Sequence, residues 1–360
     1  MRCPTLNELP SPSPGKTGWP WTEEGLQLPD TLPGGQPWPR VGIVTPSFNQ
    51  GQFIEETIRS VLLQGYPNLE YAVMDGGSTD RSVDIIRKYE PWLVYWVSEP
   101  DRGQGAAVQQ GWQASTADVL AYLNSDDTYL PGAVSSAVRS LQQCPGTPAV
   151  CGGELRIDRH GHVLRVRPAS NTSQWELLNL HFISQPATFL RRTALLSVGG
   201  VDTTFEHVFD FELWLRVTTI GAIEAVPVVL AATRWYPETK TQSQRPVIAD
   251  ELIRAVETTL IESGGWSAEQ QAQVVGGLHL LAASLYLEQP RFLVKAARSW
   301  WRAFARGSAQ RRRLLRLPLV KAKWHVQRLL ALRHHRYPTA SSGVHWSTWV
   351  KRQQQEAEVS

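Results

Sequence analysis

Apolar residues follow two alternating periodicities along residues 41–124. Short runs rich in Val, Ile, Leu and Tyr predict buried strands. These runs cover residues 41–48, 69–75, 93–99 and 118–124. Between them, apolar positions recur every three or four residues and predict helices, over residues 52–64, 82–89 and 103–116. Strands that alternate with helices in this way favour a Rossmann-like α/β fold, with a mostly parallel sheet flanked by helices.

The pattern changes on both sides of this region. Residues 1–39 are crowded with Pro, Gly and Ser and show neither period, which predicts a poorly ordered leader attached to the body by its tryptophans. A central domain is expected over 40–245. Residues 246–360 are expected to form a basic, α-helical C-terminal extension that begins with a pair of packed helices, over 248–263 and 268–289.

Composition limits the class of protein. The chain has 360 residues and 42% hydrophobic content, so it is globular, and its net charge of +3 gives no argument for a nucleic-acid partner. Three cysteines without metal-type spacing indicate reduced thiols and a cytoplasmic location. No uninterrupted apolar run reaches the roughly 18 residues that predict a membrane-spanning helix. The N-terminus also has no apolar core of the signal-peptide kind.

Basic residues and tryptophans are interleaved along residues 291–335. A basic helix with Trp and Leu on its other face can lie on the anionic inner surface of a membrane, which would make the protein peripheral. Binding to a partner protein, or simple helix packing, explains the pattern equally well. The aromatic residues form an apolar stripe, which argues against nucleic acid.

Each of the first four predicted strands ends in polar residues. These ends are Thr45-Pro46-Ser47, Asp75-Gly76-Gly77-Ser78, Glu99-Pro100-Asp101 and Asn124-Ser125-Asp126-Asp127. One such end is readily explained as a turn or a helix cap. Four in succession predict a polar rim at the carboxyl ends of the strands, where open parallel sheets bind ligands.

Four segments resemble, in order and spacing, the family 2 nucleotide-sugar glycosyltransferases of the type A fold. They are residues 41–82, 98–112, 117–127 and 199–216, and the resemblance covers roughly 41–240. It implies a transferase that moves a sugar from a nucleotide-diphosphate donor to a hydroxyl acceptor and inverts the anomeric carbon. The acceptor is expected to be a saccharide or a lipid-linked saccharide, in the synthesis of a cell-surface polysaccharide or a glycolipid.

By the same resemblance, Thr45, Pro46 and Ser47 lie against the nucleotide, and Asp75 bonds its base. The stretch from Asp101 through Gly103 to Gly105 passes under the nucleotide, and Lys240 is a phosphate contact. Arg234 lies in the same basic stretch as Lys240. A carboxylate at Asp75 can accept a bond from a ring N–H, which favours a UDP-sugar and admits thymidine.

The family's metal motif matches the stretch from Asn124 to Asp127. The resemblance places a divalent metal, Mg²⁺ or Mn²⁺, at Asp126 and Asp127, and places Asn124 and Ser125 beside the nucleotide. Asn124 departs from the family pattern, which has an aspartate there, so it can bond ribose or water but brings no charge. Asp126 takes the metal-binding place. Asp127 points away from Asp126 if the chain is extended there, which favours a role as a brace for a ligand water or as a cap of the next helix. A role as a second metal ligand stays open. A cation bridging the phosphates would lower the barrier by neutralising the leaving group.

The family's catalytic base precedes a helix like the one predicted at DFELWLR, which makes Asp210 the candidate and Glu212 the second choice. Apolar neighbours raise the pKa of a carboxyl group toward the working range of a general base. Asp210 is also well placed to be the N-cap of that helix, and the two roles are compatible. Gln185 resembles an acceptor-side polar residue.

Two other functions compete. A sugar nucleotidyltransferase should carry a Gly-rich loop with a lysine directly after the first strand. The segment PSFNQGQF at that place contains no lysine. A non-catalytic, membrane-associated scaffold would keep the fold and the basic extension and would not need Asp126 or Asp210.

Overall fold

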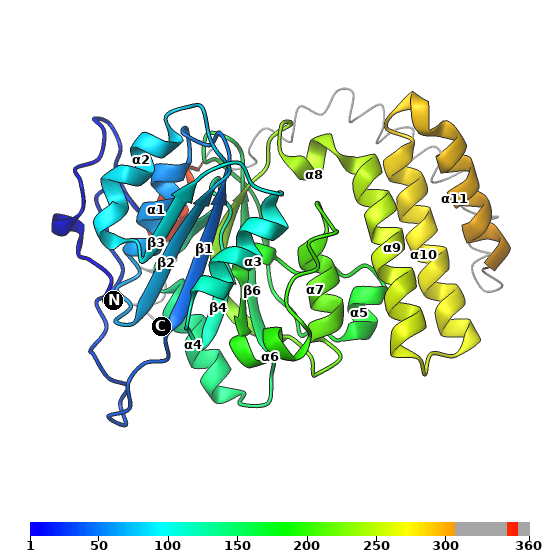
Figure 1. The fold of residues 1–360 in the computed structure, drawn as a ribbon, viewed down its shortest axis with the longest axis horizontal. Coiled ribbons are helices and arrows are strands. Elements are labelled where there is room, and N and C mark those ends of the chain that lie inside the picture. Colours follow the sequence, from blue (N-terminus) through cyan, green and yellow to red (C-terminus); the bar gives the residue numbers. More distant parts are fainter. Residues whose placement is uncertain (307–343, 352–360) are drawn as a thin grey trace.

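The structure is a computed structural model that describes residues 1–306 and 344–351. Its first half contains four parallel strands in the order β3-β2-β1-β4. The strands are β1 (Val41–Ser47), β2 (Leu69–Asp75), β3 (Tyr95–Ser98) and β4 (Val119–Tyr122). The connecting helices are α1 (Ile54–Leu62), α2 (Ser82–Tyr89) and α3 (Gln104–Ala114), and helices cover both faces of the sheet (Figure 1). The predicted alternation of strand and helix is therefore confirmed.

The second half continues the same sheet and makes it mixed. Strand β8 (Thr188–Arg191) is antiparallel to both β4 and β6 (Ala149–Ile157), so β6 again runs in the direction of β4. The remaining strands are β5 (Thr128–Tyr129), β7 (Val163–Arg167) and β9 (Glu224–Arg234). The helices are α4 (Ala133–Gln143), α5 (Gln174–Leu178), α6 (Arg192–Ser197), α7 (Phe209–Val217) and α8 (Lys240–Ser243).

The N-terminal segment 1–39 corrects one expectation. It has little regular secondary structure, yet Trp19 is fully buried and its indole N–H donates to the Tyr129 carbonyl at 2.8 Å. Arg59 of α1 is also fully buried, and its guanidinium donates to backbone carbonyls of this segment, those of Pro10, Pro20 and Trp21. The segment is thus ordered by tertiary contacts. It covers α1, which explains why that helix is buried on almost every side instead of on one face.

Three long helices form the end of the molecule opposite β1–β3 (Figure 1). They are α9 (Arg245–Ser263), α10 (Ala268–Tyr286) and α11 (Leu293–Arg306), which confirms the predicted helix pair and adds a third helix. No helix of the described residues combines the length and the apolar character needed to cross a bilayer. Residues 307–335 of the predicted basic stretch lie outside the described residues. All three cysteines are free thiols.

One residue of α9 fixes the start of α7. The Glu251 carboxylate accepts backbone hydrogen bonds from Glu206, His207 and Val208 at 3.0, 2.8 and 3.1 Å. Val208 is the N-cap of α7, and Glu206 and His207 form the bend that leads into it. A carboxylate at this place also complements the helix dipole. Although burial acts to raise it, the nearby His207 imidazole, whose Nδ1 lies 3.8 Å from the carboxylate, and the hydrogen bonds from these amides lower the pKa of Glu251 to about 2. The C-terminal helices therefore hold α7 in place.

Glu251→Gln should lower the free energy of unfolding at pH 7 by about 2 kcal/mol, because the amide loses the charge that these N–H groups stabilise. The folded-state pKa lies below the usual value of 4.5, so this stabilisation is present above pH 4.5 and is lost as the pH falls toward 2. Urea denaturation at several pH values measures it. The matched control is Glu262→Gln, at an exposed position of the same helix. Equal stability of the two variants at pH 7 would contradict the capping role.

Candidate active site

The carboxyl ends of β1–β4 meet at one edge of the sheet, as the parallel pairing requires. Asp75 ends β2 and is almost fully buried. Its carboxylate accepts hydrogen bonds from the Ser78 amide at 2.8 Å, the Ser78 hydroxyl at 2.6 Å and the Ser98 hydroxyl at 2.7 Å. A carboxylate can accept about four hydrogen bonds, so Asp75 retains room for one more donor.

The predicted nucleotide contacts on β1 separate into two groups. Thr45 is fully buried, and its hydroxyl pairs with the Tyr71 hydroxyl at 3.0 Å, so its side chain belongs to the core and not to the rim. It lies two residues before the strand end, too deep to reach a ligand. Pro46 is also buried. Ser47 ends the strand, and its buried hydroxyl has no partner among the described residues.

The start of α3 approaches both β4 and α7. Asp101 accepts a hydrogen bond from the Gly103 amide at 2.7 Å, and Gly103 adopts a φ of +101°, a conformation that favours glycine. A Cβ on Gly105 would lie 3.2 Å from the Phe209 ring. This close contact brings the start of α7, which carries Asp210, next to the start of α3.

Asn124 joins several parts of the rim. Its side-chain oxygen accepts from the Gln104 amide at 2.6 Å, and its side-chain nitrogen lies 3.3 Å from the Gln185 side-chain oxygen. Gln185 in turn donates to the Tyr122 carbonyl at 2.7 Å. Ser125, the next residue, is buried. The amide at Asn124 thus connects α3, the end of β4 and the segment before β8.

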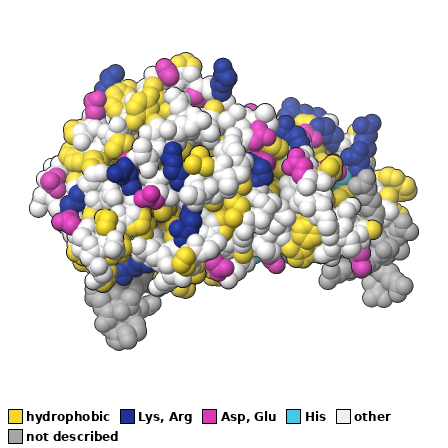
Figure 2. Space-filling model, turned by 60° about the horizontal axis from the view of Figure 1, so that its bottom comes forward, with side chains coloured by type: hydrophobic (Ala, Val, Ile, Leu, Met, Phe, Trp, Pro, Cys, Tyr) yellow, Lys and Arg dark blue, Asp and Glu magenta, His cyan; other side chains and the backbone are white. Residues whose placement is uncertain are grey.

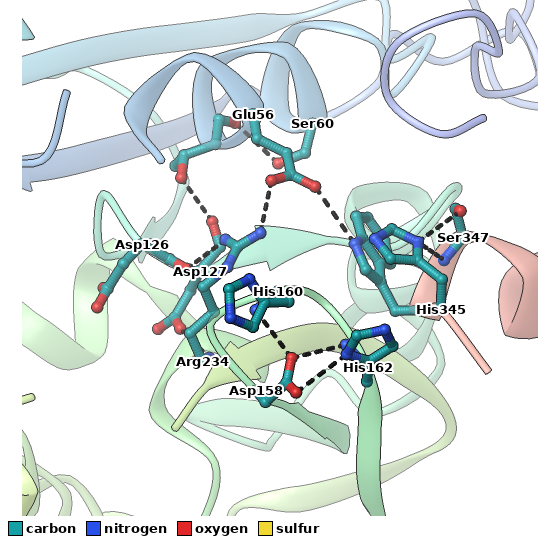
Figure 3. A network of polar contacts seen from close by, with 12 residues as sticks. Glu56, Ser60, Asp126, Asp127, Asp158, His160, His162, Arg234, His345 and Ser347 are labelled. Carbon is teal, nitrogen blue, oxygen red and sulfur yellow. Dashed lines mark hydrogen bonds and ion pairs between the residues drawn. The ribbon is translucent and has the colours of Figure 1, made fainter. Parts of the chain in front are cut away.

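Asp126 and Asp127 point to different surroundings (Figure 3). Asp126 is partly exposed, and its carboxylate accepts from the Tyr236 hydroxyl at 2.8 Å. Asp127 is buried, and its carboxylate accepts from the backbone amide of Arg234 at 2.9 Å. The expectation that Asp127 caps the next helix is wrong, since the N-cap of α4 is Gly132. Asp127 instead fixes the loop to β9.

Burial raises the pKa of both carboxyl groups, and for Asp127 the neighbouring charge of Asp126 raises it further. Two adjacent carboxylates in a desolvated place favour binding of a cation, which would offset their repulsion. Their oxygens are the donor type that Mg²⁺ and Mn²⁺ prefer. No group of three or more His, Cys, Asp or Glu side chains suited to a metal occurs within the residues that the structure describes. The arrangement therefore suits an ion held by one carboxylate together with substrate phosphates and water.

Asp210 is the second residue of α7 and not its N-cap, which is Val208. Burial raises its pKa to about 6, although the Phe211 amide donates to it at 2.8 Å. The Tyr122 ring packs against Phe209 with 5.6 Å between the ring centroids. The buried Tyr122 phenol interacts electrostatically with both Asp210 and Asp127, so both carboxylates lie near this residue. Glu212, the second choice for a base, is held in a bidentate ion pair with Arg216 at 2.6 Å and is not available.

The two basic positions predicted from the sequence differ in their surroundings. Lys240 is exposed at the first residue of α8, and no contact among the described residues joins it to the rim. Arg234, in the same basic stretch, is buried and forms an ion pair with Glu56 of α1 at 2.5 Å. Sequence reasoning missed this pair and the role of Tyr236. The only signal was the unusual Arg-Trp-Tyr run after a predicted strand.

The chain is similar in sequence and in fold to known proteins. The family model described as Glycosyl transferase family 2 matches residues 42–199. A glycosyltransferase of Mycobacterium tuberculosis, itself uncharacterized, is 32% identical over 185 residues, which make up 51% of this chain and 70% of the relative. A second uncharacterized glycosyltransferase, from Rickettsia typhi, is 27% identical over 205 residues, 54% of this chain and 64% of the relative.

Among solved structures, a mannosyltransferase from Pyrobaculum calidifontis, in complex with GDP-mannose and Mn²⁺, has the same fold. The TM-score is 0.52 and the identity 21%, with 87% of this chain and 84% of the other covered. Together, the family match, the relatives and the fold establish that this chain belongs to glycosyl transferase family 2 and is a glycosyltransferase of the type A fold.

Proposed function

We propose that this glycosyltransferase moves a sugar from a nucleotide-diphosphate donor to a hydroxyl acceptor and inverts the anomeric carbon. The observation that carries the proposal is that Asp126 and Asp127 follow β4, whose last residue Tyr122 packs against Phe209, the neighbour of Asp210, with ring centroids 5.6 Å apart. A cation-binding carboxylate and a separate carboxylate of raised pKa are the two parts that such a displacement needs.

The donor would lie along the carboxyl ends of β1 and β2. Ser47 has a hydroxyl without a partner in the described part of the chain, and Asp75 has room for one more hydrogen-bond donor. A uracil or thymine ring presents such a donor, which keeps a UDP-sugar as the first choice. Backbone amides at the start of α3, beyond Asp101 and Gly103, suit the phosphates.

Asp126 is assigned as the protein ligand of Mg²⁺ or Mn²⁺, with Tyr236 orienting its carboxylate. When bound, the ion would stabilise the negative charge that gathers on the diphosphate as it leaves. Asp127 has protein partners for its carboxylate, so we assign it to supporting the loop. Asn124 is assigned to a ribose hydroxyl or to a bound water.

Asp210 is assigned as the general base. A carboxyl group with a pKa of about 6 is mostly ionised at neutral pH and is still basic enough to take the proton of an acceptor hydroxyl as the new bond forms. Gln185 is placed on the acceptor side. The acceptor class proposed is a saccharide or a lipid-linked saccharide of a cell-surface polysaccharide or glycolipid.

An anionic membrane surface is proposed as a partner of α11. The helix carries four basic residues and no acidic one. Leu293, Val294, Trp300 and Trp301 are exposed on it. Figure 2 shows Lys and Arg side chains gathered at the end of the molecule where α9, α10 and α11 lie. Tryptophan and arginine together suit the headgroup region of an anionic bilayer.

Asp210→Asn should reduce kcat by about 10²- to 10⁴-fold, because the amide cannot accept the acceptor's proton. Donor affinity should change little, since Asp210 faces the acceptor.

In the wild type, kcat/KM should fall about tenfold per pH unit below pH 6, because protonation of the raised-pKa carboxyl group removes the base. Steady-state release of nucleotide diphosphate measures both effects. Asp84→Asn, exposed on α2, is the control. Full activity of Asp210→Asn would refute Asp210 as the base. Failure of the wild type to release nucleotide diphosphate from any donor would support the non-catalytic scaffold.

Asp126→Asn should weaken Mn²⁺-dependent binding of nucleotide diphosphate by about tenfold or more, because a neutral amide is a poor ligand for a hard cation. Isothermal titration of UDP, GDP and dTDP with and without Mn²⁺ measures the effect. Asp84→Asn serves again as the charge-matched control. If no nucleotide binds more tightly with Mn²⁺ or Mg²⁺ than without, the metal assignment is wrong.

The full-length protein should bind vesicles of phosphatidylglycerol and phosphatidylcholine, and bind vesicles of phosphatidylcholine alone far less. Raising the salt concentration should weaken the binding by screening. The double variant Trp300→Ala, Trp301→Ala should bind about tenfold more weakly, since each indole contributes buried area at the interface. Ile261→Ala, an exposed apolar position on α9, is the control. Cosedimentation measures binding, and equal binding to both vesicle types would refute a membrane partner.

A further inference from the structure

The end of the described chain returns to the catalytic domain, at the opposite end of the molecule from α11 (Figure 1). The segment 344–351 pairs with the turn between β6 and β7. The Val163 amide donates to the Val344 carbonyl at 3.1 Å, and the Trp346 amide donates to the Gly161 carbonyl at 2.8 Å. Trp346 is fully buried there. The segment is thus built into the domain and does not merely rest on its surface.

The Trp346 indole donates to one carboxylate oxygen of Glu56 at 3.2 Å. The other oxygen accepts from the Arg234 guanidinium at 2.5 Å. The Glu56 and Arg234 side chains are only 9% and 3% exposed, so their charges have little access to water. In such surroundings an ion pair keeps its geometry only when the remaining lone pairs also have donors. Trp346 supplies that donor.

The same guanidinium also reaches the proposed metal site (Figure 3). It donates to the Asp126 carbonyl at 2.6 Å, and the backbone amide of Arg234 donates to the Asp127 carboxylate at 2.9 Å. Thr57, the neighbour of Glu56 on α1, donates to the Asp127 carbonyl at 2.7 Å. A continuous series of contacts therefore connects the C-terminal segment 344–351 to Asp126 and Asp127.

We infer that Trp346 is a positioning residue of the transferase site: by fixing Glu56, it keeps Arg234 on the Asp126 peptide and so sets the affinity of the site for the cation and the donor diphosphate. This inference rests on the proposed function. Its physical basis is that a displaced Asp126 backbone carries the Asp126 carboxylate with it. In a preorganised site, a displacement of about 1 Å strongly weakens binding. Trp346 itself touches neither substrate nor metal.

Trp346→Phe is the decisive variant, because it keeps an aromatic ring in the buried place and removes the N–H. We expect Mn²⁺-dependent binding of UDP, GDP or dTDP, whichever the wild type binds, to weaken three- to tenfold. Binding without metal should change less than twofold. The control is Trp349→Phe, which makes the same change at a partly buried position of the same segment. Trp349→Phe should leave metal-dependent binding unchanged, even if it lowers the melting temperature as much as Trp346→Phe does.

Two further measurements separate positioning from general loss of packing. In a Glu56→Gln background, Trp346→Phe should weaken binding less than it does in the wild type, because both act through one carboxylate. In the metal-free protein, amide hydrogen exchange in a peptide covering 124–129 should be faster in Trp346→Phe than in Trp349→Phe. This second readout does not depend on nucleotide or on folding of the Glu56 variant.

The outcomes are distinguishable. If the wild type shows no metal-dependent nucleotide binding, the proposed function fails, and this inference fails with it. If the wild type binds and the two tryptophan variants behave alike in binding and exchange, the inference alone is refuted. An undiminished effect of Trp346→Phe in the Glu56→Gln background would also refute it.

Discussion

The cost of keeping carboxylates at the edge of a buried sheet determines how this site is built. An ionised carboxylate away from water must be matched by donors or by a cation. Asp75 has three protein donors, and Asp127 has two, the backbone amide of Arg234 and the side-chain amide of Asn124. Among the described residues, Asp126 has one donor from another residue, the Tyr236 hydroxyl, and Asp210 has one, the Phe211 amide. The two carboxylates with the fewest protein donors are the ones assigned to the cation and to the proton of the acceptor.

Segments far from the rim in sequence complete its support. The N-terminal segment covers α1 through Arg59, Glu251 of α9 holds the start of α7, and Trp346 reaches Glu56 from the C-terminal segment. Each contact fixes an element that carries a proposed functional side chain or its neighbour. The sheet places the carboxyl ends of its strands together, and these outer segments hold the loops that follow them.

Much of this arrangement could be predicted from the sequence, because alternation of strand and helix is a local pattern and parallel strands share one edge. The strand ends at Asp75 and Asp126 follow from this pattern, whereas the candidate at Asp210 came from the resemblance to a known family. The direction in which a side chain points at a strand end is not determined by the local sequence. Thr45 faces Tyr71 in the core, and Asp127 faces β9. The order of residues 1–39 was missed for the same reason, since it depends on buried tryptophans and on one arginine of α1 and not on any period.

The state of Asp210 follows from two opposing effects at the start of α7. A carboxylate in the first turn of a helix is stabilised by the helix dipole, typically by about 0.3–1 kcal/mol, which lowers its pKa. Burial acts the other way and takes the pKa from 3.8 to about 6, a shift that corresponds to about 3 kcal/mol. Burial therefore prevails. Because the folded-state pKa is the higher one, the ionised carboxylate opposes folding above pH 6, and this cost disappears as the pH falls toward 4. A residue kept solely as a helix cap would show the opposite sign, as Glu251 does with its pKa of about 2. The destabilising environment of Asp210 is thus what a general base requires and what a structural cap would avoid.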